Sequence, residues 1–227
     1  MGLRFGILVF PMIQQLDLTG PYEVFASARD AEVELVWKDH EPVKSSTGLT
    51  LTPTASFSDC PDFDVLCVPG GTGTNPLLLD ETVLTFIRKQ ATSARYVTSV
   101  CTGSLVLGAA GLLNGRRATT HWNAHDLLTH FGAIPVNERI VQDQNIITAG
   151  GVTSGIDFGL AVIAELLGRT EAETIQLILE YEPAPPFQSG TPERATQDVL
   201  ATARTRLKPT RSAREAIIAE WALSHGK

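Results

Sequence analysis

The most constraining feature of this chain is the segment at residues 96–104, where an extended apolar run ends on Cys101 and small residues follow. Ser99 lies two positions before the cysteine and Gly103 two positions after it, which is the spacing of a nucleophile elbow. An elbow requires a sharp turn from a strand into a helix, because that turn pushes one side chain out of the sheet and excludes bulky neighbours. The segment therefore predicts a strand, a turn at Cys101 and a helix.

Cys101 is predicted to be a nucleophile. The N-terminus of the following helix presents the positive end of its dipole and unpaired backbone N–H groups, and both favour the thiolate. The alternative is a buried structural cysteine, which is the common environment of an unpaired thiol. The elbow spacing and the helix position together favour the nucleophile.

The rest of the chain alternates between apolar runs of strand length and amphipathic runs of helix length. This alternation predicts an α/β fold, with a doubly wound parallel sheet covered by helices on both faces. Strands are expected at 4–10, 32–38, 49–53, 65–68, 96–100, 118–120 and 146–149. Helices are expected at 20–28, 80–91, 122–131, 154–167 and 170–181, and from the elbow to about 111.

The C-terminal part of the chain is set apart by a proline-rich segment at 182–192, which is predicted to be extended because proline cannot lie within a helix or a sheet. Two helices are expected beyond it, at 193–206 and 211–223. They are too short to form a domain of their own. We therefore expect one domain at 1–190 and a helical extension at 191–227.

Charge and cysteine usage narrow the class of protein. A net charge of −7 argues against a nucleic-acid partner. The tail at 191–227 has more Lys and Arg than Asp and Glu, and the favoured explanation is that it is solvated or docks on another subunit. Cys60, Cys67 and Cys101 form no CxxC pair and no even disulfide set, which indicates a reducing cytoplasm. The first residues are not a signal peptide and no apolar run has membrane-spanning length, so no membrane partner is expected.

Chemistry in a doubly wound sheet gathers at the carboxyl ends of the strands. The first strand leads to Asp17, the middle strand to Gly70 and Gly71, and the elbow strand to Cys101. Apolar neighbours suggest that Asp17 is partly buried, which would raise its pKa and suit it to proton transfer. The glycine pair either makes a simple turn or leaves backbone amides free for an anionic intermediate, as an oxyanion hole requires.

The sequence gives little support for catalysis by a histidine, a metal ion or a cofactor. His121 could be the base of a Cys/His hydrolase, but it follows an intervening helix and strand, so a structural or lining role is favoured. His121 and His125 are the only pair with ligand-like spacing, without a nearby third ligand, and no metal is expected. The chain contains neither GxGxxG nor GxxxxGK[ST], and no cofactor is expected.

The residues around the elbow carry a family resemblance. The segments 99–113 (SVCTGSLVLGAAGLL) and 115–122 (GRRATTHW) resemble the ThiJ/PfpI superfamily, whose members share a flavodoxin-like, class I glutamine amidotransferase-like fold. The segments 14–21 (QQLDLTGP) and 183–187 (PAPPF) resemble its isocyanide hydratase branch. The resemblance spans about residues 4–190 and weakens in the tail.

This resemblance implies a homodimeric enzyme that hydrates an isocyanide to an N-substituted formamide without a cofactor. Cys101 would attack the isocyanide carbon, and Asp17 would act first as acid and then as base. Thr102 would orient water or Asp17, and its backbone N–H would stabilise charge. The residues expected around the substrate are Leu16, Gly70, Gly71 and Thr72.

Departures from the patterns of other members of the superfamily also favour the isocyanide hydratase branch. Asp17 stands where many members have glutamate, which matches the hydratase branch and not a glyoxalase or chaperone. Thr102 stands where proteolytic relatives have histidine. About 37 residues follow the proline segment, too few for the DNA-binding region of a regulator.

Two alternatives and one dynamic feature remain open. Cys101 could be a redox sensor, because a thiolate beside a carboxylic acid oxidises readily, or the chain could be a ligand-binding regulator domain without its DNA-binding half. Gly150 and Gly151, between the strand at 146–149 and the helix from 154, could form a hinge that shifts the helix when the charge on Cys101 is lost. The alternative is that these glycines only permit close packing.

Overall fold

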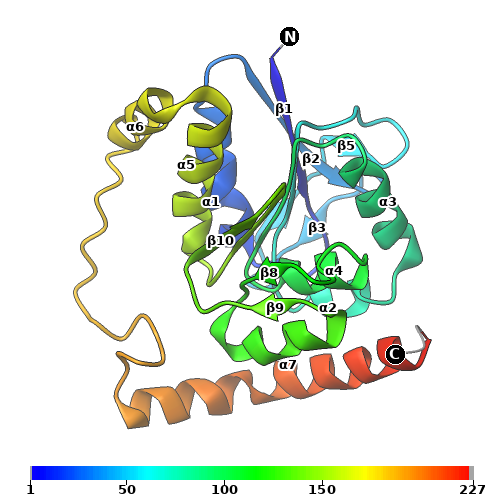
Figure 1. Cartoon of the computed structure of the whole chain (residues 1–227), viewed down its shortest axis with the longest axis vertical. Coiled ribbons are helices and arrows are strands. Elements are labelled where there is room, and N and C mark those ends of the chain that lie inside the picture. The colour runs from blue at the N-terminus through cyan, green and yellow to red at the C-terminus, as the bar shows by residue number, and fades with distance from the viewer. Residues whose placement is uncertain (1, 225–227) are drawn as a thin grey trace.

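The computed structural model describes residues 2–224, which build a seven-stranded sheet in the order β10-β11-β7-β6-β1-β2-β5 (Figure 1). Neighbouring strands are parallel except β10 and β11, which pair antiparallel. The strands are β1 (Leu3–Leu8), β2 (Ala31–Trp37), β5 (Ala55–Ser56), β6 (Val65–Val68), β7 (Tyr96–Val100), β10 (Ile140–Asp143) and β11 (Ile146–Ala149).

The central strands are buried along nearly their whole length because both faces of the sheet are covered. Every residue of β6 and β11 is buried, as is every residue of β7 after Tyr96. Continuous burial of this kind is typical of a parallel sheet between two helical layers, and it explains why these segments do not alternate between apolar and polar residues.

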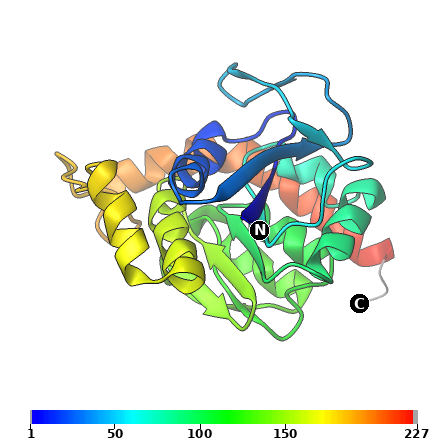
Figure 2. The same cartoon turned by 90° about the horizontal axis from the view of Figure 1, so that it is seen from above.

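Helices cover both faces of the sheet, which confirms the predicted α/β fold (Figures 1 and 2). One layer consists of α1 (Gln15–Ala26), α5 (Ser154–Leu167) and α6 (Arg169–Ile178). The other contains α3 (Glu81–Ala91) and α4 (Gly103–Ala109), and the short α2 (Thr74–Leu77) follows β6. The 3-10 helix at Trp122–Phe131, which we call η1, ends at Gly132 with a left-handed φ of 73°.

Two small paired segments lie outside the main sheet. The predicted strand at 49–53 is β4 (Thr50–Leu51), which pairs with β3 (Val43–Lys44) and not with the main sheet. The predicted strand at 118–120 is β8 (Arg117–Ala118), which pairs with β9 (Ile134–Pro135). Neither segment is therefore an edge of the central sheet.

The predicted start of the first helix is wrong. The Gly20–Pro21 pair indicated a helix beginning there, whereas α1 begins at Gln15 and contains Pro21. Pro21 is buried against α5, where a Cβ atom on Gly155 would lie 2.9 Å from its ring. Packing between α1 and α5 thus holds a helix whose interior includes a residue that disfavours it.

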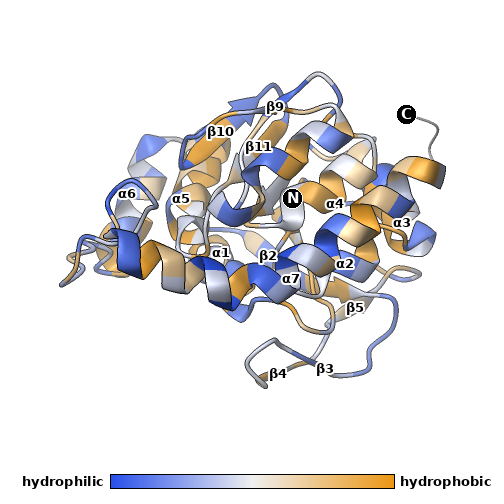
Figure 3. Cartoon of the chain, turned by 90° about the horizontal axis from the view of Figure 1, so that it is seen from below, coloured by the Kyte–Doolittle hydropathy of each residue, from blue (hydrophilic) through white to orange (hydrophobic). Residues whose placement is uncertain are grey.

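The two helices predicted in the tail are one continuous helix, α7 (Gln197–Ser224), with Pro209 inside it. Docking of its C-terminal half, where Ile218 and Trp221 are buried, accounts for continuity through the proline. The segment at 182–192 contains no helix or strand, as predicted, and connects α6 to α7 along the outside of the molecule (Figure 1). Hydrophobic and hydrophilic residues alternate along α7 (Figure 3).

Candidate functional site

Cys101 occupies a strained turn between β7 and α4. Its φ of 55° lies in the left-handed region, which a residue with a Cβ atom seldom adopts. Its carbonyl oxygen accepts hydrogen bonds from Thr120 Oγ1 at 2.8 Å and Ser104 Oγ at 3.2 Å. A Cβ atom at Gly103 would lie 1.9 Å from the Val68 carbonyl oxygen. The turn therefore has the geometry that the elbow spacing predicts.

Asp17 lies in the first turn of α1 and is fully buried beside Cys101. Its Oδ2 accepts a hydrogen bond from the Gly70 backbone N–H at 2.9 Å, while Oδ1 is buried and has no hydrogen-bond partner among the described residues. Burial raises the pKa of Asp17 to about 7, against the opposing effects of hydrogen bonds with Gly70 and Cys101. The carboxyl group can therefore both donate and accept a proton near neutral pH.

The expectation that Cys101 is a stabilised thiolate is wrong. Burial and the neighbouring Asp17 carboxylate raise the pKa of the Cys101 thiol, and the Thr102 N–H and the Arg214 guanidinium oppose that rise. Helix α4 has only seven residues, so its dipole does not outweigh desolvation and a nearby negative charge. The thiol and the carboxyl group form a coupled pair that can pass one proton between them.

The glycine loop after β6 positions side chains and does not leave its amides free, which corrects the expected oxyanion hole. The Gly70 amide is bonded to Asp17, and the Gly71 amide donates to Thr102 Oγ1 at 3.1 Å. Gly71 has a φ of 124°, and a Cβ atom there would lie 2.4 Å from the Gln14 nitrogen. A Cβ atom at Gly70 would lie 2.6 Å from the Thr102 nitrogen. Both glycines are thus required by crowding, Gly70 against Asp17 and Thr102 and Gly71 against the backbone of Met12 and Gln14.

The Thr102 side chain sits in a small hydroxyl network. Its Oγ1 lies 3.1 Å from Thr74 Oγ1 and donates to the Gly71 carbonyl oxygen at 3.3 Å. Thr74 in turn donates to the same Gly71 carbonyl at 2.8 Å. Thr74 could not be identified from the sequence, because a threonine at the start of a short helix carries no distinguishing pattern.

A cavity of about 190 Å³ opens on Cys101, and four predicted site residues line it: Gly71, Thr72, Cys101 and Thr102. The other lining residues are Gln14, Ser46, His121, Asn123, Val152, Leu207, Thr210 and Arg214. Asp17 and Gly70 lie behind this wall. Leu16 does not line the cavity and is 38% exposed, because adjacent helical residues point about 100° apart and Asp17 takes the inward direction.

Helix α7 supplies Leu207, Thr210 and Arg214 to the cavity, and none of the three was predicted from the sequence. A signal was present in their spacing. Residues 207, 210, 214, 218 and 221 follow the three- and four-residue steps of one helix face. Arg214 interrupts this otherwise largely apolar stripe, and a cation in such a position suggests a buried charge.

His121 lies in the cavity wall, in keeping with the expected lining role. Its Nδ1 accepts a hydrogen bond from the Asn123 backbone N–H at 3.3 Å. Burial, together with the nearby Arg214 charge, lowers the pKa of His121 to about 4. The ring is therefore neutral near pH 7 and a weak base.

Gly150 and Gly151 show no close packing that requires glycine, so the packing alternative is contradicted. A Cβ atom at Gly150 would find its nearest neighbour at 3.6 Å, and one at Gly151 at 3.9 Å, both ordinary contact distances. Neither glycine has a φ in the left-handed region. The hinge remains a prediction.

Residues 2–224 contain no group of three or more His, Cys, Asp or Glu side chains that could hold a metal ion. In the same range, no helix combines the length and apolar character needed to cross a bilayer.

Comparison with known proteins gives consistent results. The model of the DJ-1/PfpI family matches residues 4–165. A Pseudomonas putida protein described as isonitrile hydratase is 61% identical over 210 residues, which cover 92% of each chain. The structure of a ThiJ/PfpI family protein from Pseudomonas syringae has a TM-score of 0.93 at 43% identity, covering 96% of this chain and 91% of the other. Drosophila melanogaster DJ-1beta, at 23% identity and a TM-score of 0.72, shows the shared fold alone. The chain belongs to the DJ-1/PfpI family.

Proposed function

We propose that this protein is an isocyanide hydratase, a lyase that converts isocyanides and water to N-substituted formamides. The observation that carries the proposal is the 61% identity to the Pseudomonas putida isonitrile hydratase over 92% of both chains. An aligned stretch of that length in a chain of 227 residues includes Cys101. The coupled Cys101–Asp17 pair beside a small cavity supplies the groups that the reaction needs.

The first half of the proposed reaction makes a thioimidate. The Cys101 sulfur attacks the terminal carbon of R–N≡C and forms the S–C bond, while the thiol proton passes to Asp17. Protonated Asp17 delivers that proton to the same carbon, so the triple bond becomes the C=N bond of R–N=CH–S–Cys101. The raised pKa of Asp17, about 7, suits this relay because the group must gain and lose one proton within the same turnover.

The second half releases the formamide. Asp17, again a carboxylate, takes a proton from water as the hydroxyl oxygen attacks the thioimidate carbon, and the proton passes to nitrogen. The tetrahedral adduct R–NH–CH(OH)–S–Cys101 then loses the C–S bond, gives R–NH–CHO and returns a proton to the thiol. Oδ1 of Asp17 accepts no hydrogen bond from the described residues, so it is suited to accept one from water. The Thr102 hydroxyl, in the cavity wall, is suited to orient that water molecule.

The assembly and cellular setting belong to the same proposal. We propose a cytoplasmic homodimer in which residues 1–190 form the catalytic domain and 191–227 a helical extension. Support for a subunit contact comes from large apolar side chains that are exposed in this chain, among them Leu177, Ile178 and Phe187 at 80%, 68% and 79%. The redox-sensor alternative is disfavoured, because peroxide reacts with a thiolate and burial raises the pKa of the Cys101 thiol.

The test is incubation of the protein with aryl and alkyl isocyanides, followed by detection of the formamide. Cys101→Ser should lose turnover and the covalent adduct, whereas Cys60→Ser should retain most activity. Cys67→Ser is a second control, because Cys67 is buried within β6. Absence of formamide with several isocyanides would refute the proposed function, and substantial turnover by Cys101→Ser would refute covalent catalysis.

A further inference from the structure

Arg214 is a buried cation in the wall of the Cys101 cavity. Its residue is 4% exposed, and its Nε donates to Asn75 Oδ1 at 2.9 Å. Asn75, in α2, is itself 7% exposed. Among residues 2–224 no carboxylate forms an ion pair with this guanidinium. A buried charge without a counter-charge is unfavourable, so the position calls for an explanation.

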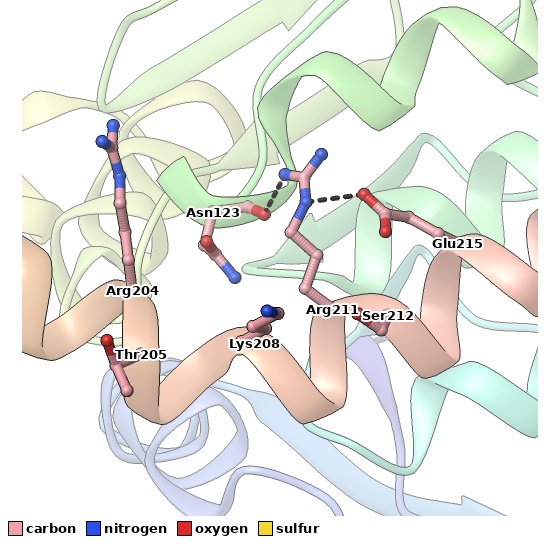
Figure 4. Close-up of a pocket in the computed structure, with 7 residues that line it drawn as sticks. All are labelled: Asn123, Arg204, Thr205, Lys208, Arg211, Ser212 and Glu215. Atoms are coloured by element: carbon pink, nitrogen blue, oxygen red, sulfur yellow. Dashed lines mark hydrogen bonds and ion pairs between the residues drawn. The ribbon is translucent and has the colours of Figure 1, made fainter.

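The docking of α7 fixes Arg214 in this place. Arg211, almost one turn earlier, binds Asp126 through two hydrogen bonds of 3.0 and 2.7 Å and donates to the Asn123 carbonyl oxygen at 2.7 Å. It lies in a groove of about 450 Å³ between α7 and η1 (Figure 4). Further along the helix, Trp221 packs on Phe131 with ring centroids 4.7 Å apart.

The negative charge available to Arg214 is that of the Asp17–Cys101 pair. The titratable and charged groups around the pair and Arg214 are Asp17, Cys67, Cys101, His121 and Arg211. Burial raises the pKa of Cys67 to about 12, and the pKa of His121 is lowered to about 4, so both are neutral near pH 7. The charge of Arg211 is balanced by Asp126 and Glu215.

We infer that Arg214 is a positioning residue that keeps a single negative charge on the Asp17–Cys101 pair, and that α7 thereby completes the reactive centre. Asn75 holds the guanidinium in place, and the charge acts through the cavity on the nucleophile. The purpose of this device rests on the proposed function, because attack on the isocyanide requires sulfur to act as the nucleophile while Asp17 handles the proton. The charge effect itself can be tested without an isocyanide.

The first measurement compares two alkylating reagents of similar size at Cys101. Iodoacetate is anionic and iodoacetamide is neutral, and the rate of each is followed by mass spectrometry of the Cys101 peptide. Arg214→Met should lower the iodoacetate-to-iodoacetamide rate ratio by about fivefold, because the cation that attracts the anionic reagent is lost. Lys208→Met removes the same charge from another face of α7 and should leave the ratio within about twofold of the unaltered protein. An unchanged ratio in folded Arg214→Met would overturn the inference.

The second measurement is the pH profile of the iodoacetamide rate. Loss of the cation disfavours the anionic form of the Asp17–Cys101 pair. The acidic limb of the pH profile should therefore move to higher pH by about one unit in Arg214→Met. Arg214→Lys retains the charge, so the midpoint of its acidic limb should lie close to that of the unaltered protein. A limb that does not move in Arg214→Met would mean that Arg214 only supports the helix, because a purely structural role changes amplitude and stability but not this midpoint.

A third variant keeps the test decisive if Arg214→Met does not fold. Asn75→Asp preserves the side-chain shape and the hydrogen bond to Arg214 but adds a carboxylate that neutralises the guanidinium. It should lower the reagent ratio and raise the midpoint in the same direction as Arg214→Met, and wild-type values would overturn the inference. If isocyanide turnover fails while these alkylation effects are found, the proposed function is refuted and the electrostatic role of Arg214 stands.

Discussion

At the scale of single residues, the site depends on one carboxyl group that is fully buried beside Cys101. Asp17 precedes the second turn of α1, and its inward direction results from helical periodicity together with the Gly70 amide that receives it. The same burial that gives Asp17 a pKa of about 7 also raises that of Cys101. The two groups must therefore be understood as one titrating unit.

Asp17→Asn should lower kcat by a factor of about 100 or more, because an amide keeps the shape and loses the exchangeable proton. KM should change far less. Steady-state kinetics with one isocyanide would measure both constants, and Asp17→Glu, which keeps the acid but displaces it by one methylene, should also lose activity. A normal kcat in Asp17→Asn would mean that water or another residue transfers the proton.

The pKa of Asp17 also predicts how stability depends on pH. The folded pKa of about 7 exceeds the ordinary value of 3.8, so between these values the folded state binds more protons than the unfolded state. Stability from this group is therefore fully present below pH 4 and is lost as pH rises through 7, with an upper limit on the order of 4 kcal/mol. The difference in melting temperature, Asp17→Asn minus the unaltered protein, should increase from pH 5 to pH 8. A difference that does not vary with pH would contradict the burial of an ionisable Asp17.

At the scale of elements, two connections govern the site: the junction of β11 with α5, and the docking of α7 on η1. Space for a side chain is available at Gly150, where the nearest atom to a Cβ would be the Arg139 carbonyl oxygen at 3.6 Å. The strand and helix can therefore keep their arrangement with a Cβ atom at this position. Any loss of function there would reflect restricted motion more than lost packing.

Gly150→Thr is expected to slow a step after thioimidate formation, leaving a first-turnover burst and a reduced steady rate. The melting temperature should change little, because the added Cβ atom meets ordinary contacts. Pre-steady-state traces recorded beside melting curves would test both statements. Equal slowing of every phase with an unchanged melting temperature would argue against the hinge.

Arg211→Ala should loosen α7 by removing its bonds to Asp126 and to the Asn123 carbonyl. Because both ionic partners are partly exposed, the free energy of unfolding should fall by only about 1 kcal/mol. Backbone amides of α7 should exchange faster with deuterium, with those of β6 and β7 unaffected. Arg204→Ala, on the same helix and without an ion pair in the described structure, serves as the control.

At the scale of the whole molecule, the proposed homodimer should appear in solution as a particle of twice the 24.4 kDa chain mass. Light scattering coupled to size-exclusion chromatography would measure it. Replacing Leu177 and Ile178 by serine should weaken association if the exposed apolar residues of α6 meet the partner. A monomer at micromolar concentration would contradict the proposal.

Local patterns were sufficient to predict the sheet, the elbow and the approach of Asp17 to Cys101, because buried parallel strands, turns and carboxyl-edge positions depend on residues close in the sequence. The continuity of α7 was not predictable, since Pro209 breaks a helix in isolation and only packing far along the chain compensates. The hydrogen bonds made by the Gly70 and Gly71 amides and the raised pKa of Cys101 could not be predicted from the sequence either. Both depend on atoms brought together from α1 and from the turns that follow β6 and β7.

The cavity wall joins residues near position 14 to residues near position 214, and this has a consequence for the newly made chain. A ribosome completes the nucleophile, its acid and the glycine loop well before it makes the helix that covers them. At ordinary rates of synthesis the interval between residues 101 and 214 lasts roughly 5–20 s. During that interval Cys101 lacks the α7 side of its wall, so electrophiles in the surrounding solution have their freest access to it before the chain is finished.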